Sequence, residues 1–153
     1  MEIEVSAARA EDVPAVEQLV REAYEPYVER IGRKPGPLLD DYATIVGQGR
    51  ALVARDRGRI VGLLITSVRP DHLLVENVAV ADSVRGTGLG ARLLRIAEEQ
   101  ARAEGLDEIR LYTHELMTEN VAYYPRHGFV ETHRRTDNGF PRAFFSRRLP
   151  PRP

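Results

Sequence analysis

The stretch that decides the fold is "VENVAVADSVRGTGLGARLL", Val75 to Leu94, in which three glycines fall within five positions. Gly86, Gly88 and Gly90 follow an apolar run typical of a strand and precede leucines at helical spacing. A helix start presents unpaired N–H groups and the positive end of the helix dipole, and glycine lets an anion approach the backbone. The stretch therefore predicts a phosphate-binding turn between a strand and a helix.

Other kinds of glycine turn compete for this pattern. A Walker loop is excluded because no Gly-Lys-Ser/Thr ending is present. Gly86-x-Gly88-x-x-Ala91 does match the dinucleotide fingerprint, and Glu115 lies downstream as an acidic residue. That fingerprint belongs to the first turn of a parallel sheet, whereas about half of this chain precedes the glycines. A purely structural turn with close helix packing is the remaining alternative.

Composition narrows the class of protein. The 153 residues are 42% hydrophobic and 29% charged with a net charge of -1, which excludes a disordered chain and gives no basic field for nucleic acid. The length favours a single domain, which we place at residues 1–149 with a frayed tail at 150–153.

Several kinds of site and location are excluded by what the sequence lacks. Without cysteine there is no disulfide framework, thiolate metal site or cysteine nucleophile, and the scattered histidines have no metal-ligand spacing, so we expect no metal. No signal peptide or membrane-length apolar stretch is found. We therefore expect a cytoplasmic protein with no membrane and no nucleic-acid partner.

Periodicity and turn residues predict an α/β fold. Three successive strands before the glycines indicate an antiparallel meander, and Asp12 is the expected cap of the first helix. The hairpin turns are expected at Asp56-Arg57-Gly58 and Asp137-Asn138-Gly139. The expected elements are a strand over 3–8, a helix over 11–28, a short helix after Asp41, strands over 51–56, 59–68 and 73–80, a helix over 89–106, a strand over 108–114, a short helix over 118–129 and a hairpin over 129–149.

Two separated motifs carry a family resemblance. Arg85, Gly88 and Gly90 resemble the acetyl-CoA-binding motif of the GNAT superfamily of N-acetyltransferases, Arg/Gln-x-x-Gly-x-Gly/Ala. The later "ENVAYYPRHGF" is similar to that superfamily's second motif, with Asn120 and Tyr124 before Gly-Phe. The resemblance extends from residue 3 to 149 and implies a mixed, mostly antiparallel central sheet of about six to seven strands flanked by about four helices.

The resemblance implies transfer of an acetyl group from acetyl-CoA, the co-substrate, to a primary amine by direct attack in a ternary complex. The acceptor would be a small molecule or a protein terminus, and a homodimer is left open. The cofactor-binding residues that it implies are Val78, Ala79, Val80, Arg85, Gly86, Thr87, Gly88, Leu89, Gly90, Ala91, Asn120 and Tyr124. For Asn120, a helix cap is the alternative. The alternative function is a non-catalytic acyl-CoA-binding module.

The resemblance makes Tyr124 the proton donor to the departing CoA thiolate. Pro125 follows it and disfavours helical geometry at the preceding residue, so a bend there would bring Tyr123 inward instead.

An alkylammonium with a pKa near ~10 cannot attack a thioester, so a base must take its proton. Glu76 is the preferred base because it shares strand parity with Val78 and Val80, whose backbone the resemblance assigns to the pantetheine arm. The substitutes for this role are His72, His114 and Glu115.

The acceptor pocket is the least determined part. In this kind of fold it is built from the segment after the first helix and from the last hairpin, which makes Tyr42 and the Asn138–Phe140 region candidates. Asp40 and Asp41 would attract a cationic amine or, alternatively, cap the following helix. The substrate residues that we single out are Tyr24, Tyr27, Asp41 and His114.

Overall fold

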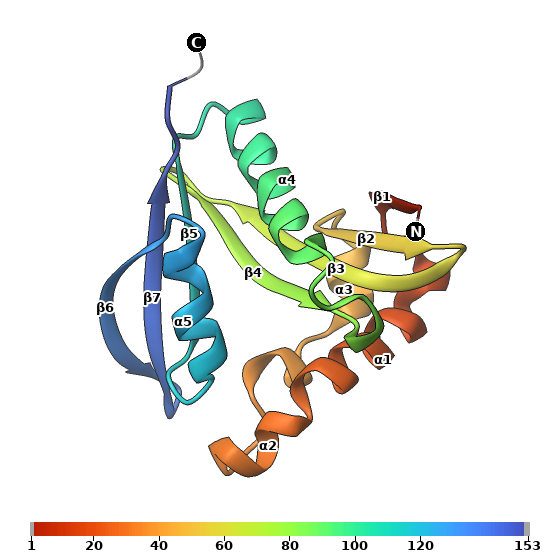
Figure 1. The fold of residues 1–153 in the computed structure, drawn as a ribbon, viewed down its shortest axis with the longest axis horizontal. Helices are drawn as coiled ribbons and strands as arrows, with labels where there is room; N and C mark the ends of the chain where they lie inside the picture. Colours follow the sequence, from red (N-terminus) through yellow and green to blue (C-terminus); the bar gives the residue numbers. More distant parts are fainter. Residues whose placement is uncertain (1, 152–153) are drawn as a thin grey trace. The chain divides into compact units, whose positions relative to one another are not determined.

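The computed structural model describes residues 2–151, and it shows a mixed sheet of seven strands in the order β1-β2-β3-β4-β5-β7-β6 (Figure 1). The expected fold class is confirmed, with five α-helices where about four were expected. The elements are β1 (Ile3–Ala7), α1 (Val13–Tyr24), α2 (Pro26–Ile31), α3 (Tyr42–Gly47), β2 (Ala51–Asp56), β3 (Arg59–Val68), β4 (Leu73–Val80), α4 (Leu89–Ala103), β5 (Glu108–His114), α5 (Thr118–Arg126), β6 (Val130–Asp137) and β7 (Phe140–Arg148), with short 3₁₀ turns η1 (Ala10–Asp12), η2 (Gly36–Leu39) and η3 (Asp82–Val84).

The chain forms two compact units. The first unit contains the residues up to Thr66 together with Asn77–Leu94, and the second contains Ser67–Glu76 and the chain from Arg95 onwards. Both β4 and α4 contribute residues to each unit.

In the first unit, β1, β2 and β3 form an antiparallel ladder. The β2–β3 turn is the expected one, and Arg57 and Gly58 both have positive φ, at 53° and 81°. Two such residues form a turn whose twist matches that of the strands. The core of the ladder is apolar, with Val53 and Leu63 fully buried.

Helix α1 buries Val16, Leu19 and Val20 on one face, as its spacing predicts. Asp12 occupies the N-cap position of this helix as expected, but its side chain makes no capping hydrogen bond. Asp12 instead forms a buried ion pair with Arg55 of β2 and accepts a hydrogen bond from the Arg9 amide at 2.8 Å. A buried carboxylate gains more from a charged partner than from a helix N–H alone, and the pair joins η1 to β2.

Helix α4 begins at the glycine turn and buries its leucines. Close approach to β3 requires Gly62, since a Cβ there would lie 3.0 Å from the Ala54 Cβ and 3.1 Å from a methyl of Leu89. Gly105, with φ at 72°, follows the helix as expected.

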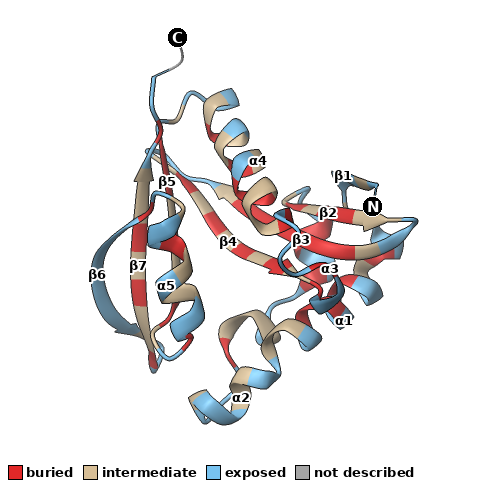
Figure 2. Cartoon of the chain, in the orientation of Figure 1, coloured by how far each residue is buried: buried red, intermediate tan, exposed pale blue. Residues whose placement is uncertain are grey.

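In the second unit, β4 pairs in parallel with β5 over three residues, Leu73–Val75. Strands β5, β7 and β6 are antiparallel neighbours, and α5 lies along this part of the sheet (Figure 1). The β6–β7 turn is the expected one, with Asn138 and Gly139 at positive φ. Strand β6 is exposed along most of its length (Figure 2).

The frayed tail was expected at residues 150–153, of which 152 and 153 lie outside the described residues. Arg102 donates a hydrogen bond to the Pro150 carbonyl at 2.7 Å, so the chain is held at that point. In residues 2–151, every helix is too short or too polar to cross a membrane.

Candidate functional site

The turn before α4 has the backbone that its glycines predicted. Gly86 and Gly88 have φ of 77° and 88°, a conformation that L side chains rarely adopt. A Cβ at either position would meet no atom within 4 Å. Conformation, not crowding, therefore requires glycine here, and the space above the backbone is open to a ligand.

This turn directly precedes the 15-residue helix α4. The first helical bond runs from the Arg92 amide to the Gly88 carbonyl at 3.0 Å, and the Thr87 amide and hydroxyl both donate to the Val84 carbonyl. For the amides of Gly86, Gly88 and Gly90, no acceptor is found within residues 2–151. Free amides at a helix N-terminus form an anion site.

Arg85 supplies a positive charge at the same turn. Its side chain is 65% exposed and its Nε lies 2.9 Å from the Asp82 carboxylate. Exposed pairs of this kind are weak, so the guanidinium can exchange Asp82 for a phosphate at little cost.

Strand β4 has two faces of different exposure. Val75, Asn77 and Ala79 are buried, and the alternate positions Glu76 and Val78 are half-buried. Glu76 thus shares the half-buried face of β4 with Val78 and Val80.

The three substitutes for the base have other partners. His72 lies 2.6 Å from the Asp71 carboxylate, and Glu115 lies 4.0 Å from Arg134. His114 is buried, and its Nδ1 accepts a hydrogen bond from the Leu116 amide at 3.1 Å, which occupies the nitrogen lone pair that would take a proton. The choice of Glu76 as the base stays a prediction.

Helix α5 continues through Pro125 to Arg126, so Pro125 does not end the helix. A proline so close to the helix end removes few hydrogen bonds. The ring of Tyr124 is buried and packs against Phe129 and Phe145 at 5.7 Å between ring centroids. Tyr123 instead stacks on His127 at 4.1 Å. Tyr124, and not Tyr123, is the inward residue.

The Tyr124 hydroxyl is suited to donate a proton. Burial raises its pKa above the ordinary value for tyrosine, so the phenol stays protonated. Within the described chain the hydroxyl has no hydrogen-bond partner, although 7% of the residue remains exposed. Its proton is therefore available to an incoming acceptor.

Asn120 does not cap α5, because Met117 occupies the cap position. The Asn120 side chain instead donates through its Nδ2 to the Thr113 hydroxyl on β5 at 3.3 Å. This bond links the helix that carries Tyr124 to the sheet. Asn120, Tyr124 and His114 all belong to the second unit.

The expected acceptor residues have separate roles. Asp41 caps α3, where its carboxylate accepts from the Thr44 amide at 3.1 Å and the Thr44 hydroxyl at 2.8 Å, and these bonds lower its pKa. Tyr27 lies under the Arg30 guanidinium at 4.9 Å. The Tyr24 hydroxyl donates to Asn77 of β4 at 2.7 Å.

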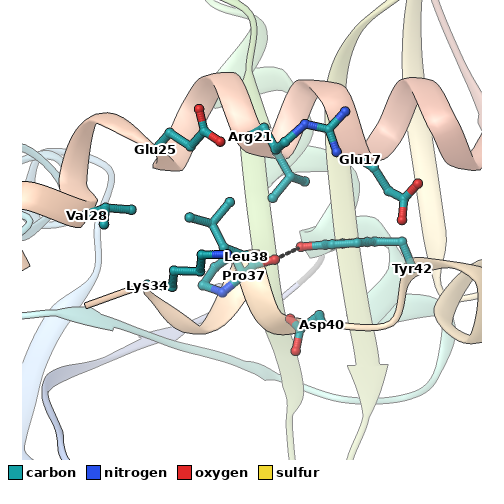
Figure 3. Close-up of a pocket in the computed structure, with 10 residues that line it drawn as sticks. Glu17, Arg21, Glu25, Val28, Lys34, Pro37, Leu38, Asp40 and Tyr42 are labelled. Atoms are coloured by element: carbon teal, nitrogen blue, oxygen red, sulfur yellow. Dashed lines mark hydrogen bonds between the residues drawn. The ribbon is translucent and has the colours of Figure 1, made fainter.

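A pocket of about 520 Å³ lies in the first unit (Figure 3). Figure 3 shows α1 along one side and the segment from Pro37 to Tyr42 along the other. We call it the α1 pocket, and it is lined by Glu17, Val20, Arg21, Glu25, Val28, Lys34, Pro37, Leu38, Asp40 and Tyr42. Asp40 lines it, whereas its neighbour Asp41 is used as a cap.

Sequence reasoning missed Asn77. The signal was present, because an asparagine at a buried position of an otherwise apolar strand requires hydrogen-bond partners. Its side chain is 4% exposed and bonds to two tyrosines. Among residues 2–151 there is also no group of three or more His, Asp or Glu side chains that could hold a metal ion.

Comparisons with known proteins identify the family of this chain. The model of the acetyltransferase (GNAT) family matches residues 14–129. An IAA acetyltransferase of Azospirillum brasilense is 30% identical over 119 residues, which cover 76% of this chain and 78% of that protein.

Solved structures share the fold. The PaiA N-acetyltransferase of Thermoplasma acidophilum, in complex with coenzyme A, has a TM-score of 0.81 at 16% identity over 97% of this chain and 100% of that one. The ribosomal-protein-S18-alanine N-acetyltransferase of Escherichia coli has a TM-score of 0.75 at 18% identity, covering 97% and 94%.

Proposed function

Because the chain belongs to the GNAT family of acetyltransferases, we propose that it transfers an acetyl group from acetyl-CoA to a primary amine by direct attack in a ternary complex. The observation that carries the proposal is the turn of Gly86 and Gly88, with free amides before a long helix and an exposed arginine beside it. This arrangement suits the pyrophosphate of CoA.

The chemistry assigns one task to each residue. Glu76 takes a proton from the ammonium, and the neutral amine attacks the thioester carbonyl. The Val78 N–H stabilises the oxyanion that forms, the C–S bond then breaks, and Tyr124 donates its proton to the CoA thiolate. The attacking nitrogen loses its second proton as the amide forms, and that proton, passed through solvent, restores the phenol of Tyr124. The buried, neutral phenol of Tyr124 supports the last of these roles.

The α1 pocket is our proposed acceptor site. Its volume of about 520 Å³ lies within the ~300–1,000 Å³ of small-molecule sites. Apolar side chains and charges of both signs line it, which suits the body of a small amine or the first residues of a peptide.

Calorimetric titration with acetyl-CoA and, separately, with NADH tests the meaning of the glycines. Saturable binding of acetyl-CoA alone is the expected result, and binding of NADH alone would overturn the proposal. The amine acceptor is then sought by thiol release with a panel of alkylamines, amino acids and short unblocked peptides.

The matched variants are Gly88→Val and Gly58→Val. Both glycines have positive φ and open space around a new Cβ, so valine strains the backbone similarly at each. Only Gly88→Val places a side chain over the proposed pyrophosphate site. Loss of a single charged hydrogen bond, worth at least ~1.5 kcal/mol, weakens binding about tenfold, so we expect at least that loss for Gly88→Val and none for Gly58→Val.

A further inference from the structure

Asn77 lies at the centre of a buried hydrogen-bond chain in the first unit. The Tyr24 hydroxyl donates to the Asn77 Oδ1 at 2.7 Å, and the Asn77 Nδ2 donates to the Tyr42 hydroxyl at 3.2 Å. The Tyr42 hydroxyl in turn donates to the Pro37 carbonyl. We call these four residues the Asn77 chain.

The hydrogen bonds of the Asn77 chain all run in the same direction, from Tyr24 through Asn77 and Tyr42 to Pro37. Both tyrosine hydroxyls donate, and the Asn77 amide uses its oxygen and its nitrogen for different partners. Asn77 and Tyr42 are each 4% exposed, so a missing bond would leave a buried polar atom without water. Such a chain permits few arrangements of the segments that it joins.

The segments that it joins are the walls of the α1 pocket. Pro37 and Tyr42 line one side, and Tyr24 ends the helix that forms the other. Asn77 itself lies on β4, directly before Val78, to which we assign the oxyanion contact. The neighbouring buried positions, Val75 and Ala79, are apolar, so filling the core would not require an amide here.

We propose that Asn77 is a positioning residue for the acceptor, because it fixes both walls of the α1 pocket to the strand that holds the thioester. The inference rests on the proposed acetyl transfer. Misplacement of reacting groups by about 1 Å can cost ~100-fold in rate, so a fixed distance between pocket and strand has a direct catalytic value.

The test begins with Asn77→Leu, which keeps the approximate size and removes both hydrogen bonds. Amide hydrogen exchange of the unliganded protein should rise about tenfold over residues 36–47, because local opening becomes easier by the loss of a buried hydrogen bond. Exchange in the β1–β2 ladder should stay unchanged, and so should the affinity for acetyl-CoA. The matched control is Tyr112→Phe, a tyrosine of β5 in the second unit.

A double variant separates positioning from folding. Asn77→Leu together with Tyr24→Phe removes both members of the bond between the Tyr24 hydroxyl and the Asn77 oxygen, so no donor is left without that oxygen and part of the thermal stability returns, while Tyr42 keeps its bond to Pro37. If Asn77 positions the acceptor, the KM for the best amine of the panel rises at least about tenfold in both variants and does not recover with stability. If KM recovers together with the melting temperature, the role is structural and the proposal is overturned.

The hydrogen-exchange experiment needs no amine substrate, so it tests the inference even if the panel identifies no acceptor amine. Unchanged exchange over residues 36–47 in Asn77→Leu overturns the inference. Failure of the wild-type protein to bind acetyl-CoA would instead overturn the proposed function, and the two failures are thus distinct.

Discussion

Two buried tyrosines, Tyr42 in the first unit and Tyr124 in the second, differ in how their hydroxyl groups are used. Burial raises the pKa of both phenols above the ordinary value. The Tyr42 hydroxyl donates to Pro37 and accepts from Asn77. The Tyr124 hydroxyl has no such partner in the described part of the chain.

The difference separates a hydroxyl that stabilises the fold from one that is available for chemistry. A buried hydroxyl with both bonds made is costly to remove and has no proton to give. A protonated hydroxyl without a partner contributes little to stability, and its hydrogen-bonding capacity is left for a ligand. Substitution of each tyrosine by phenylalanine should therefore affect different measurements.

The largest effect is expected for Tyr124→Phe. Removal of a general acid should lower kcat by about 10²- to 10⁴-fold, measured as thiol release with saturating acetyl-CoA and acceptor. The affinity for acetyl-CoA and the melting temperature should hardly change, because the phenylalanine ring keeps the packing against Phe129 and Phe145. If kcat survives, the proton-donor role is wrong. Tyr123→Phe is the matched control and should leave kcat unchanged.

Tyr42→Phe should give the opposite result. It removes the acceptor of the buried Asn77 Nδ2 and the donor to the Pro37 carbonyl, and an unsatisfied buried polar group costs about 1–3 kcal/mol. Urea denaturation should show this loss in the free energy of unfolding. A variant as stable as the wild type would mean that the Tyr42 hydroxyl is not structural, and the comparison with Tyr124 would fail.

A smaller effect on stability is expected for Asp41→Ala. The Asp41 carboxylate, like the Tyr42 hydroxyl, is used for structural hydrogen bonds. Asp41 is exposed and makes two bonds to Thr44 at the start of a short helix, so its loss should lower the melting temperature less than Tyr42→Phe does. The KM for the acceptor should be unchanged. A raised KM with an unchanged melting temperature would assign Asp41 to the acceptor site after all.

The local elements could be predicted from sequence because their signals are local. The glycine turn, the two hairpin turns with left-handed residues and the spacing of the α4 leucines each depend on nearby residues. The motif resemblance added the mostly antiparallel central sheet, because turn and spacing signals do not specify which distant strands pair.

Long-range partners could not be predicted in the same way. Asp12 has the sequence context of a helix cap, yet its charge is used by Arg55, 43 positions away. Asn77 bonds to Tyr24 and Tyr42, 53 and 35 positions away. A sequence shows that such a group needs a partner, whereas only the folded chain shows which one it finds.

The smallest effect is expected in the pH dependence of kcat, where Tyr124 should cause no change. Because burial raises the pKa of Tyr124 above the ordinary value near 10, the phenol should remain protonated throughout the range from about pH 6 to pH 9. The profile of kcat against pH should therefore show no alkaline fall in this range that depends on Tyr124. Its measurement in wild type and Tyr124→Phe decides the point, since a fall below pH 9 that disappears in the variant would mean that the hydroxyl ionises easily. The Tyr124 hydroxyl would then have to be more exposed to solvent than the packing of its ring indicates.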